Sequence, residues 1–150
     1  MRTSGIIHPQ LIELVAAAGH GDRIVLADAG LRIPSGARRV DIGLTCGVPT
    51  MVQVLAVLRG DLVIEAAEVA REFAEWSPET HAAVVAELGM EPTAVRPHVE
   101  LMADMADHAY AYVKTGDAAA YSSVVVTCGV SFLDAAIAHF TEVHGRPPSM

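Results

Sequence analysis

The sequence predicts an α/β fold: a single three-layer domain with helices packed on a largely parallel or mixed sheet. Two observations carry this prediction. Helix-like and strand-like patterns alternate along the chain, and residues 23–28 (RIVLAD) form a continuous apolar run between Gly21 and Gly30, which is typical of a strand covered on both faces. The chain has 150 residues, of which 52% are hydrophobic, so it is the size of one domain with a substantial core.

The elements in the first half of the chain follow from periodicity and from stop residues. Residues 8–19 (HPQLIELVAAAG) are rich in helix formers and end at a glycine, which predicts a helix. Residues 38–44 (RRVDIGL) and 61–66 (DLVIEA) are expected to be strands. Between them, residues 49–60 (PTMVQVLAVLRG) predict a helix that begins at a proline and ends at a glycine.

Two consecutive helices are expected next. Residues 66–76 (AAEVAREFAEW) predict the first. In the second, residues 77–89 (SPETHAAVVAELG), Ser77 is the expected N-cap, Pro78 the first helical residue and Gly89 the stop.

The last third of the chain is expected to contain two strands and two helices. Residues 93–97 (TAVRP) predict an edge strand, because the run ends at a proline. Residues 98–116 predict one long amphipathic helix, and residues 122–129 (SSVVVTCG) the last strand. Residues 131–145 predict a closing helix with Ser131 as its cap, followed by a loose tail.

Charge and composition narrow the classes of partner. Ten basic and eighteen acidic residues give a net charge of −8, and no basic cluster is longer than ARR, so nucleic acid is not an expected partner. The first ten residues lack the apolar core of a signal peptide, and Asp134 interrupts the apolar stretch nearest to membrane-spanning length. We therefore expect a soluble cytoplasmic protein without a membrane partner.

Two further compositional features concern thiols and assembly. Cys46 and Cys128 are far apart and form no CxxC motif, which favours two buried, reduced thiols over a disulfide or a zinc site. A mean hydropathy of +0.38 with 19% charged residues is high for a small monomer, whose surface must stay polar. This favours a homo-oligomer.

Asp28 and His20 bracket the first strand, and each has two interpretations. Asp28 follows the strand at its carboxyl end, where ligands collect in α/β sheets, but an aspartate beside Gly30 also commonly caps a turn. His20 follows a helix, whose dipole favours a protonated imidazole, so it is either a capping residue or a site residue. Position along the chain leaves both alternatives open.

His98 occupies the same class of location as Asp28, just after a strand and at the start of a helix. A metal site of His98, Asp104 and His108 is conceivable, but the spacing of the last two often arises by chance and no second motif supports it. The motifs GxGxxG, GxxxxGK[ST], HExxH and GxSxG are absent. The remaining histidines are interpreted as residues of helix surfaces or helix ends: His8, His81, His139 and His144.

A resemblance to a known family rests on five segments taken in order. They are GHGDRIVLADAGLRIP, RRVDIGLTCGVPTMVQVLAVL, IEAAEVAREF, the PH pair at 97–98, and TGDAAAYSSVVVTCGVSF. Together they resemble the D-ribose pyranase and fucose mutarotase (RbsD-like) family, closer to the ribose branch. The resemblance covers residues 5–132 of the single domain 1–150, and residues 133–150 form a C-terminal helix and tail without a match.

The resemblance implies a cofactor-free sugar mutarotase that interconverts pyranose and furanose forms, or anomers, of a monosaccharide, with D-ribose as the expected substrate. It implies no metal, and a homo-oligomer, a decamer or an octamer, with active sites between subunits. The family's proton donor falls on His20. Substrate-binding positions fall on Asp28, His98, Tyr121, Ser122 and Ser123, the last three standing where the family has Tyr-Ala-Asn.

These residue types suit the chemistry. A cyclic sugar opens when the anomeric hydroxyl loses a proton and the ring oxygen gains one, and histidine is the side chain best suited to such transfers near neutrality. A carboxylate can orient a hydroxyl and favours a charged imidazole close to it. Eight extended residues rise up to about 26 Å from His20 to Asp28. Either the chain bends sharply, or His20 of one subunit meets Asp28 of a neighbour, which is the arrangement we expect.

Ser123 departs from the family pattern, because a serine hydroxyl is shorter than an amide and offers fewer hydrogen bonds. The sugar hydroxyl that the amide would reach is then contacted through water, or the preferred sugar is not ribose. Two alternatives therefore stay open. One is a fucose-type mutarotase, and the other is a non-catalytic sugar-binding module of a sugar uptake system.

Overall fold

Six strands form one mixed sheet in the computed structural model, which describes residues 5–148. In chain order they are β1 (Arg23–Ala27), β2 (Arg39–Asp41), β3 (Ile64–Ala70), β4 (Ala94–Arg96), β5 (Ala111–Lys114) and β6 (Val124–Cys128). Across the sheet their order is β2-β5-β1-β6-β3-β4. β6 runs antiparallel to both of its neighbours, β1 and β3, whereas the other neighbouring pairs are parallel. The sheet is therefore mixed.

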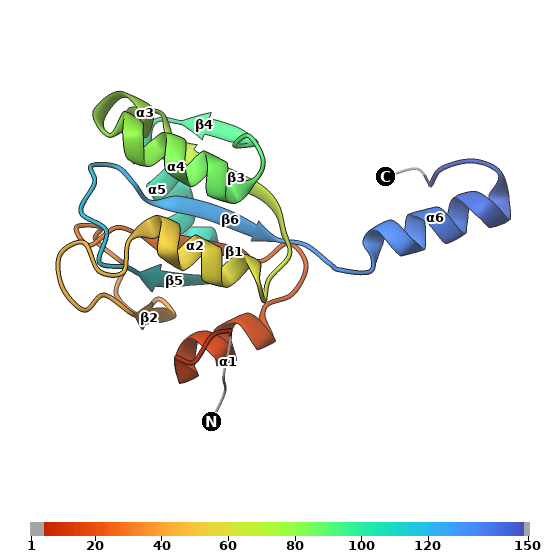
Figure 1. The fold of residues 1–150 in the computed structure, drawn as a ribbon, viewed down its shortest axis with the longest axis horizontal. Coiled ribbons are helices and arrows are strands. Elements are labelled where there is room, and N and C mark those ends of the chain that lie inside the picture. Colours follow the sequence, from red (N-terminus) through yellow and green to blue (C-terminus); the bar gives the residue numbers. More distant parts are fainter. Residues whose placement is uncertain (1–4, 149–150) are drawn as a thin grey trace.

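Helices cover both faces of this sheet (Figure 1). They are α1 (Pro9–Ala17), α2 (Met51–Arg59), α3 (Arg71–Trp76), α4 (Pro78–Leu88), α5 (His98–His108) and α6 (Leu133–His144). Side chains of α1, α2, α3 and α4 contribute to one core, and those of α5 pack against the opposite face. The three-layer α/β domain predicted from the sequence is confirmed.

The uninterrupted apolar run in the sequence forms β1, a strand that is buried on both faces of the sheet. Successive side chains of a strand point to opposite faces of the sheet. Ile24 and Leu26 enter the larger core, whereas Val25 and Ala27 enter the smaller core beneath α5. All four are fully buried, so the strand is covered on both sides as predicted.

The capping signals act where the sequence places them in α2 and α4. Thr50 and Gln53 form a capping box at the start of α2, in which each side chain binds the other residue's main-chain N–H. Pro78 is the first residue of α4. Gly89 ends that helix with φ of +68°, a conformation in which a Cβ is unfavourable.

The expected long helix over residues 98–116 is wrong in its second half. α5 ends at His108, and after a two-residue connection the chain forms β5, which lies between β2 and β1. Tyr112 is buried against α5, and Val113 is buried in the larger core. Burial on both faces of the sheet thus overrides the helical periodicity of this segment.

The expected boundary between strand and helix at residue 66 is also wrong. β3 continues to Ala70, paired with β6 on one side and β4 on the other, and α3 is short. Ala67 and Val69 are fully buried in the larger core. Pairing on both edges therefore holds a sequence rich in helix formers in the extended conformation.

The two expected serine caps have different outcomes. Ser77 is the N-cap residue of α4 as predicted, but its hydroxyl donates to the carbonyl of Ala120 at 3.1 Å and makes no cap bond to the helix. α6 begins after Phe132, without a side-chain cap, so Ser131 is not its N-cap. Both elements form nonetheless.

The two cysteines differ in environment. Cys128 is buried as expected, but Cys46 is exposed, because it lies in the loop before α2 rather than in the core. Burial first, and then the charges of Asp22 and Glu65, raise the pKa of Cys128 to about 11. That thiol is therefore protonated and a poor nucleophile near neutrality.

The last helix lies outside the body of the domain. α6 extends away from the domain (Figure 1). Of the expected loose tail, residues 146–147 are exposed, and residues 149–150 lie outside the described residues. None of the helices in the described part of the chain is long and apolar enough to cross a bilayer.

Candidate functional site

A pocket opens at the carboxyl end of β1 with a volume of about 360 Å³. We call it the β1 pocket. It is lined by Asp28, Gly30, Leu31, Arg32, His98, Met102 and Tyr121. Three of the predicted site residues thus come together from three separate segments: the turn after β1, the start of α5 and the loop before β6.

Asp28 closes the turn after β1 and also lines the β1 pocket. Its Oδ1 accepts a hydrogen bond from the N–H of Gly30 at 2.8 Å, which closes the turn. Its Oδ2 accepts from the hydroxyl of Ser123 at 2.7 Å, and that hydroxyl accepts in turn from the N–H of Asp28 at 3.1 Å. The carboxylate is therefore fixed in orientation while it lines the β1 pocket.

Tyr121 has an unusual backbone conformation for a residue that is not glycine. Its φ of 59° lies in the left-handed region, which for a bulky residue signals local strain. The centroid of its ring lies 5.1 Å from the ring centroid of His98 and 5.7 Å from that of Trp76, and both pairs have edge-to-face geometry. These contacts hold the phenol in the wall of the pocket.

His98 is placed by the anchoring of α5. Its main-chain N–H donates to Glu72 Oε2 at 2.9 Å. The pKa of Glu72 is lowered, first by the main-chain N–H of Glu72 itself and then by that of His98. The first turn of α5 is thereby tied to α3.

The middle of α5 is held by an ion-pair network. Asp104 Oδ2 accepts from Arg96 at 2.9 Å and from Arg23 at 3.1 Å, and both arginines also pair with Glu68. Arg96 first and Arg23 second lower the pKa of Asp104 to about 2. The network joins α5 to β1, β3 and β4 and so fixes the helix that carries His98.

The metal site of His98, Asp104 and His108 is not formed. Asp104 is occupied by arginines, and its Oδ1 binds His108 Nδ1 at 2.9 Å, one helical turn away. Among the described residues, no three histidine, cysteine or carboxylate side chains are arranged to hold a metal ion.

Ser122 and Ser123 point in opposite directions. Ser123 supports Asp28, whereas Ser122 is fully buried and donates to Asp117 Oδ1 at 2.8 Å. Ser122 is thus not brought to the β1 pocket within this subunit.

Asp117 is a buried residue that the sequence interpretation missed. Its carboxylate accepts from the N–H groups of Met51 at 2.8 Å and Ala119 at 2.9 Å, besides the hydroxyl of Ser122. Its carbonyl accepts from the N–H of Ala29 at 2.8 Å. The residue joins the start of α2, the turn after β1 and the loop that carries Tyr121. It was missed because the preceding segment was expected to be helical, and only the observed β5 places Asp117 just after a strand.

His20 lies at the other end of β1 and does not line the β1 pocket. Its Nε2 is 2.9 Å from Glu65 Oε2, and its side chain is 56% exposed. The four steps of β1 alone span roughly 13 Å at about 3.3 Å each, and no sharp bend returns His20 toward Asp28. The two residues therefore do not share a pocket within one subunit.

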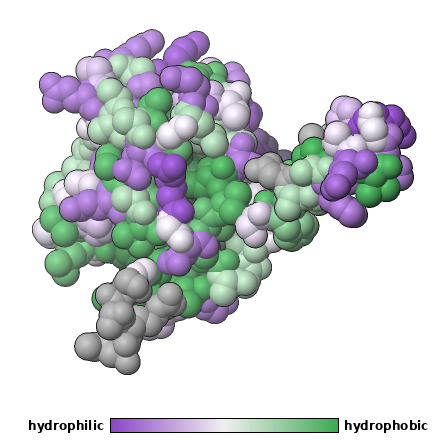
Figure 2. All heavy atoms as spheres, turned by 45° about the vertical axis from the view of Figure 1, so that its right-hand side comes forward, coloured by the Kyte–Doolittle hydropathy of each residue, from purple (hydrophilic) through white to green (hydrophobic). Residues whose placement is uncertain are grey.

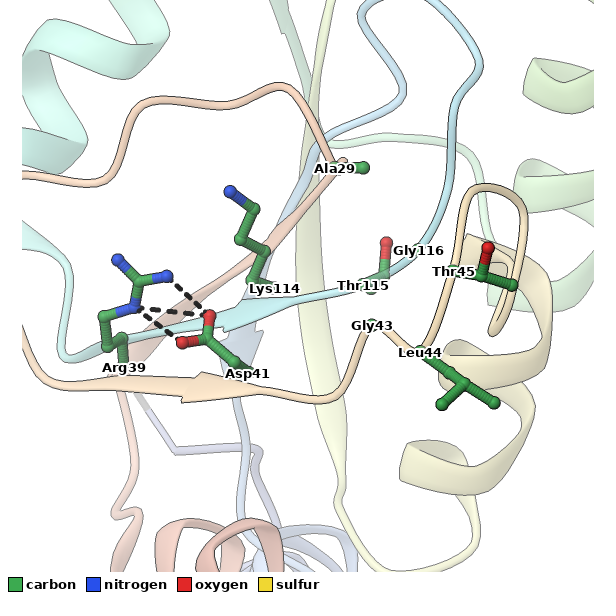
Figure 3. Close-up of a pocket in the computed structure, with 9 residues that line it drawn as sticks. All are labelled: Ala29, Arg39, Asp41, Gly43, Leu44, Thr45, Lys114, Thr115 and Gly116. Carbon is green, nitrogen blue, oxygen red and sulfur yellow. Dashed lines mark hydrogen bonds and ion pairs between the residues drawn. The ribbon is translucent and has the colours of Figure 1, made fainter.

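A second hollow of about 340 Å³ is lined in part by Ala29 of the turn after β1 (Figure 3). Arg39 and Asp41 line it and form a 2.6 Å ion pair, and Lys114, the sole lysine of the sequence, also lines it. None of the predicted sugar-binding residues belongs to this hollow.

Apolar surface is exposed on the body of the molecule and on the projecting C-terminal helix (Figure 2). Large exposed apolar side chains include Ile7, Leu44, Trp76, Val99 and Phe132. A groove of about 500 Å³ between α1 and α2 is also lined mainly by apolar residues. Such exposure is typical of surfaces that bind another protein.

Comparison with known proteins decides the family. Residues 1–131 match the model of the RbsD / FucU transport protein family. The chain belongs to this family. It is 40% identical over 139 residues to a D-ribose pyranase of Vibrio vulnificus, and 37% identical over 132 residues to one of Symbiobacterium thermophilum. Each alignment covers 88% of this chain and 100% of the relative.

Solved structures of the family share the fold. Bacillus subtilis RbsD complexed with D-ribose superposes with a TM-score of 0.81 at 29% identity, covering 88% of this chain and 100% of that one. The fucose mutarotase of Streptococcus pneumoniae, in complex with L-fucose, gives a TM-score of 0.63 at 23% identity, covering 83% and 94%. The latter similarity concerns the fold alone.

Proposed function

We propose that this member of the family is a cofactor-free sugar mutarotase that interconverts pyranose and furanose forms of a monosaccharide, with D-ribose as its substrate. The observation that carries the proposal is the convergence of Asp28, His98 and Tyr121 on one pocket. Relatives named D-ribose pyranase, at 37–40% identity over their whole length, support the choice of ribose.

The β1 pocket suits a sugar in size and in chemistry. The carboxylate of Asp28, fixed by Gly30 and Ser123, is an acceptor for sugar hydroxyls. The rings of Tyr121 and His98 offer an apolar wall for the sugar C–H groups and polar tips for its hydroxyls. Ser123 uses its hydroxyl both to donate to and to accept from Asp28, so it orients the carboxylate.

The proton donor in this proposal is His20 of a neighbouring subunit. Because Glu65 binds Nε2, the nitrogen left for the sugar is Nδ1. A protonated Nδ1 gives its proton to the ring oxygen while the anomeric hydroxyl gives its proton to the carboxylate of Asp28, so the ring C–O bond breaks and an open-chain aldehyde forms. A different hydroxyl then attacks the aldehyde and closes the other ring size. The proton of the attacking hydroxyl returns to His20, and the aldehyde oxygen takes back the proton held by Asp28.

The arrangement between subunits rests on the separation of His20 and Asp28 within one chain, together with the exposed apolar surface. Mixing His20→Ala with Asp28→Ala subunits tests it. After subunit exchange, about a quarter of the sites combine an intact His20 with an intact Asp28, so activity returns to that level. A mixture that stays inactive, although subunit exchange is demonstrated by mass spectrometry, would contradict the shared site.

Activity itself is measured by NMR magnetisation transfer between the anomeric signals of ribose, fucose and other aldoses at equilibrium. We expect protein-dependent exchange that is greatest with ribose and falls by on the order of 10²- to 10⁴-fold in His20→Ala. Greater exchange with fucose would identify the fucose-type alternative. Sugar binding without any exchange would identify a binding module of an uptake system.

The proposal also places the enzyme in the cytoplasm as a homo-oligomer. The two cysteines are free thiols, which suits a reducing compartment. Light scattering of the purified protein measures the number of subunits, and a monomer at working concentration would contradict the shared site.

A further inference from the structure

We infer that α6 docks on a neighbouring copy of this chain, where its apolar face covers the rim of that copy's β1 pocket. The inference rests on the proposed function in one respect, namely that His20 enters the pocket of a neighbouring subunit. The molecule on which α6 docks is therefore a second copy of the same chain.

α6 is an addition to the family domain. The family model ends at residue 131, and the relatives are matched over their whole length without this helix. Among the described residues, α6 contributes no side chain to either core and makes no hydrogen bond or ion pair to another element. It extends away from the domain (Figure 1).

The composition of α6 shows that it needs a surface to pack on. An isolated helix of 12 residues is marginally stable in water. Leu133, Ile137, Phe140 and Val143 recur at helical spacing and lie on one face, and Val143 remains 61% exposed. Leu133, Ile137 and Phe140 are half-buried, and none of these face residues belongs to either core, so the face is available to a second copy of the chain.

The starting point of α6 lies beside the proposed proton donor. β6 is antiparallel to β1, so its last residue lies where β1 begins, and the Cys128 carbonyl accepts from the N–H of Gly21 at 2.8 Å. The next residue, Gly129, packs against Glu65, the partner of His20: a Cβ on Gly129 would lie 3.1 Å from that of Glu65. The chain therefore leaves the domain at the end that carries His20.

The start of α6 beside His20 determines which surface of the neighbouring subunit α6 contacts. When His20 enters the β1 pocket of a neighbour, that neighbour occupies the space beyond this end of the sheet, which is the space into which α6 extends (Figure 1). The four residues 129–132 that precede α6 reach at most roughly 14 Å from β6. α6 consequently begins close to the pocket that receives His20.

The rim of the β1 pocket offers a matching apolar surface. Trp76 is 67% exposed and its ring contacts that of Tyr121 at 5.7 Å. Val99, which follows His98, is 78% exposed. Exposed apolar side chains that gather beside polar groups are typical of surfaces that bind a partner. Phe132 and the apolar face of α6 supply that cover, and they would exclude water from the bound sugar.

Cysteine cross-linking tests the contact in the full-length chain. In a Cys46→Ser background, we combine Phe132→Cys with Trp76→Cys, while Cys128 stays buried and protonated. Oxidation is expected to join subunits and to give a ladder on a non-reducing gel. The matched variant, Ala138→Cys with Trp76→Cys, places its thiol on the opposite face of α6 and is expected to give none. A cross-link within one chain, or no cross-link in an intact oligomer, overturns the inference.

A second pair of substitutions tests the same face without thiols. Ile137→Asp with Phe140→Asp is expected to raise KM for ribose several-fold and to weaken the oligomer. Ala135→Asp with Ala138→Asp adds the same charge on the opposite face and is expected to change neither. Equal effects of the two pairs would overturn the docking.

Failure of the inference can be told from failure of the proposed function. Cross-linking of His20→Cys with Met102→Cys reports on the shared site alone. If this pair joins subunits and the wild type exchanges ribose anomers, but Phe132→Cys does not cross-link to Trp76→Cys, only the docking of α6 is wrong. If His20→Cys fails to cross-link as well, the shared site is wrong and the inference falls with it.

Discussion

Glu65 and His20 form a carboxylate–imidazole pair at the amino-terminal end of β1, with 2.9 Å between Oε2 and Nε2. The two residues are 45 positions apart: His20 lies in the turn before β1, and Glu65 lies in β3. Neutral histidine carries its proton on one nitrogen only, and a carboxylate fixes that proton on the nitrogen it contacts. In the proposed mechanism, Glu65 therefore determines which nitrogen of His20 is left to face the sugar.

Replacement of Glu65 by alanine should slow sugar exchange without abolishing it. A loss of orientation worth ~1.4 kcal/mol corresponds to about tenfold in rate, less than the loss expected for His20→Ala. NMR of ¹⁵N-labelled His20 at high pH should show the Nε2–H tautomer in the wild type and a mixture of tautomers in Glu65→Ala. A wild type that carries the proton on Nδ1 would contradict this role.

Substitutions of the two adjacent serines should affect different quantities, sugar binding in one case and stability in the other. Ser123→Ala removes the hydroxyl that orients the carboxylate of Asp28. The loss of ~1 kcal/mol in the free energy of sugar binding should raise KM for ribose roughly fivefold, with little change in the melting temperature. Ser122→Ala should lower the melting temperature and leave KM unchanged, since its hydroxyl binds Asp117. The prediction fails if both variants affect the same quantity.

Asp117→Ala should be among the most destabilising single substitutions outside the apolar core. Three donors lose their buried acceptor, which should cost roughly 3 kcal/mol or more in the free energy of unfolding. Asp117→Asn keeps one carbonyl oxygen and should lose less. Urea denaturation measures both, and an alanine variant as stable as the wild type would contradict the role of this residue.

Asp104 should make stability depend on acidity. Its pKa in the folded state, about 2, lies below the ordinary value of 3.8, so its contribution is fully present above about pH 4 and is lost as the pH falls through about 2. Asp104→Asn should be less stable than the wild type at neutral pH, and the difference should shrink below about pH 4. Asp107→Asn, on the same helix, is the control. A difference that stays constant with pH would contradict the ion-pair network.

Much of the fold could be predicted from the sequence because local signals and burial agree there. The run from Arg23 to Ala27, the capping box at Thr50 and the stop at Gly89 each specify one element. β5 could not be predicted in this way, because Ala111–Lys114 continues the pattern of α5 and becomes a strand only through pairing with β1 and β2. Pairing between segments that are distant in sequence has no local signal.

Some features of the candidate site could likewise be predicted from the sequence, and others could not. Asp28 and His98 follow strands, and this position could be inferred from the pattern of the sequence alone. The opposite directions of Ser122 and Ser123 follow from the alternation of side chains at the start of a strand, a signal that the sequence also carries. The contact of His20 with Glu65 depends on β3 and β6, and no spacing along the chain predicts it.

The order of the strands has a consequence for biosynthesis. β1 lies between β5 and β6, and Val25 faces Tyr112 on one side and Val125 on the other. One of the two central strands of the sheet is thus among the first segments to leave the ribosome, and its partners are among the last. Until residue 128 has emerged, β1 has no complete partner strand at one of its two edges. The sheet therefore forms completely only after nearly the whole chain has been made. A ribosome that stalls in the second half of the message would release an apolar strand without its partners, which is a substrate for chaperones rather than for assembly.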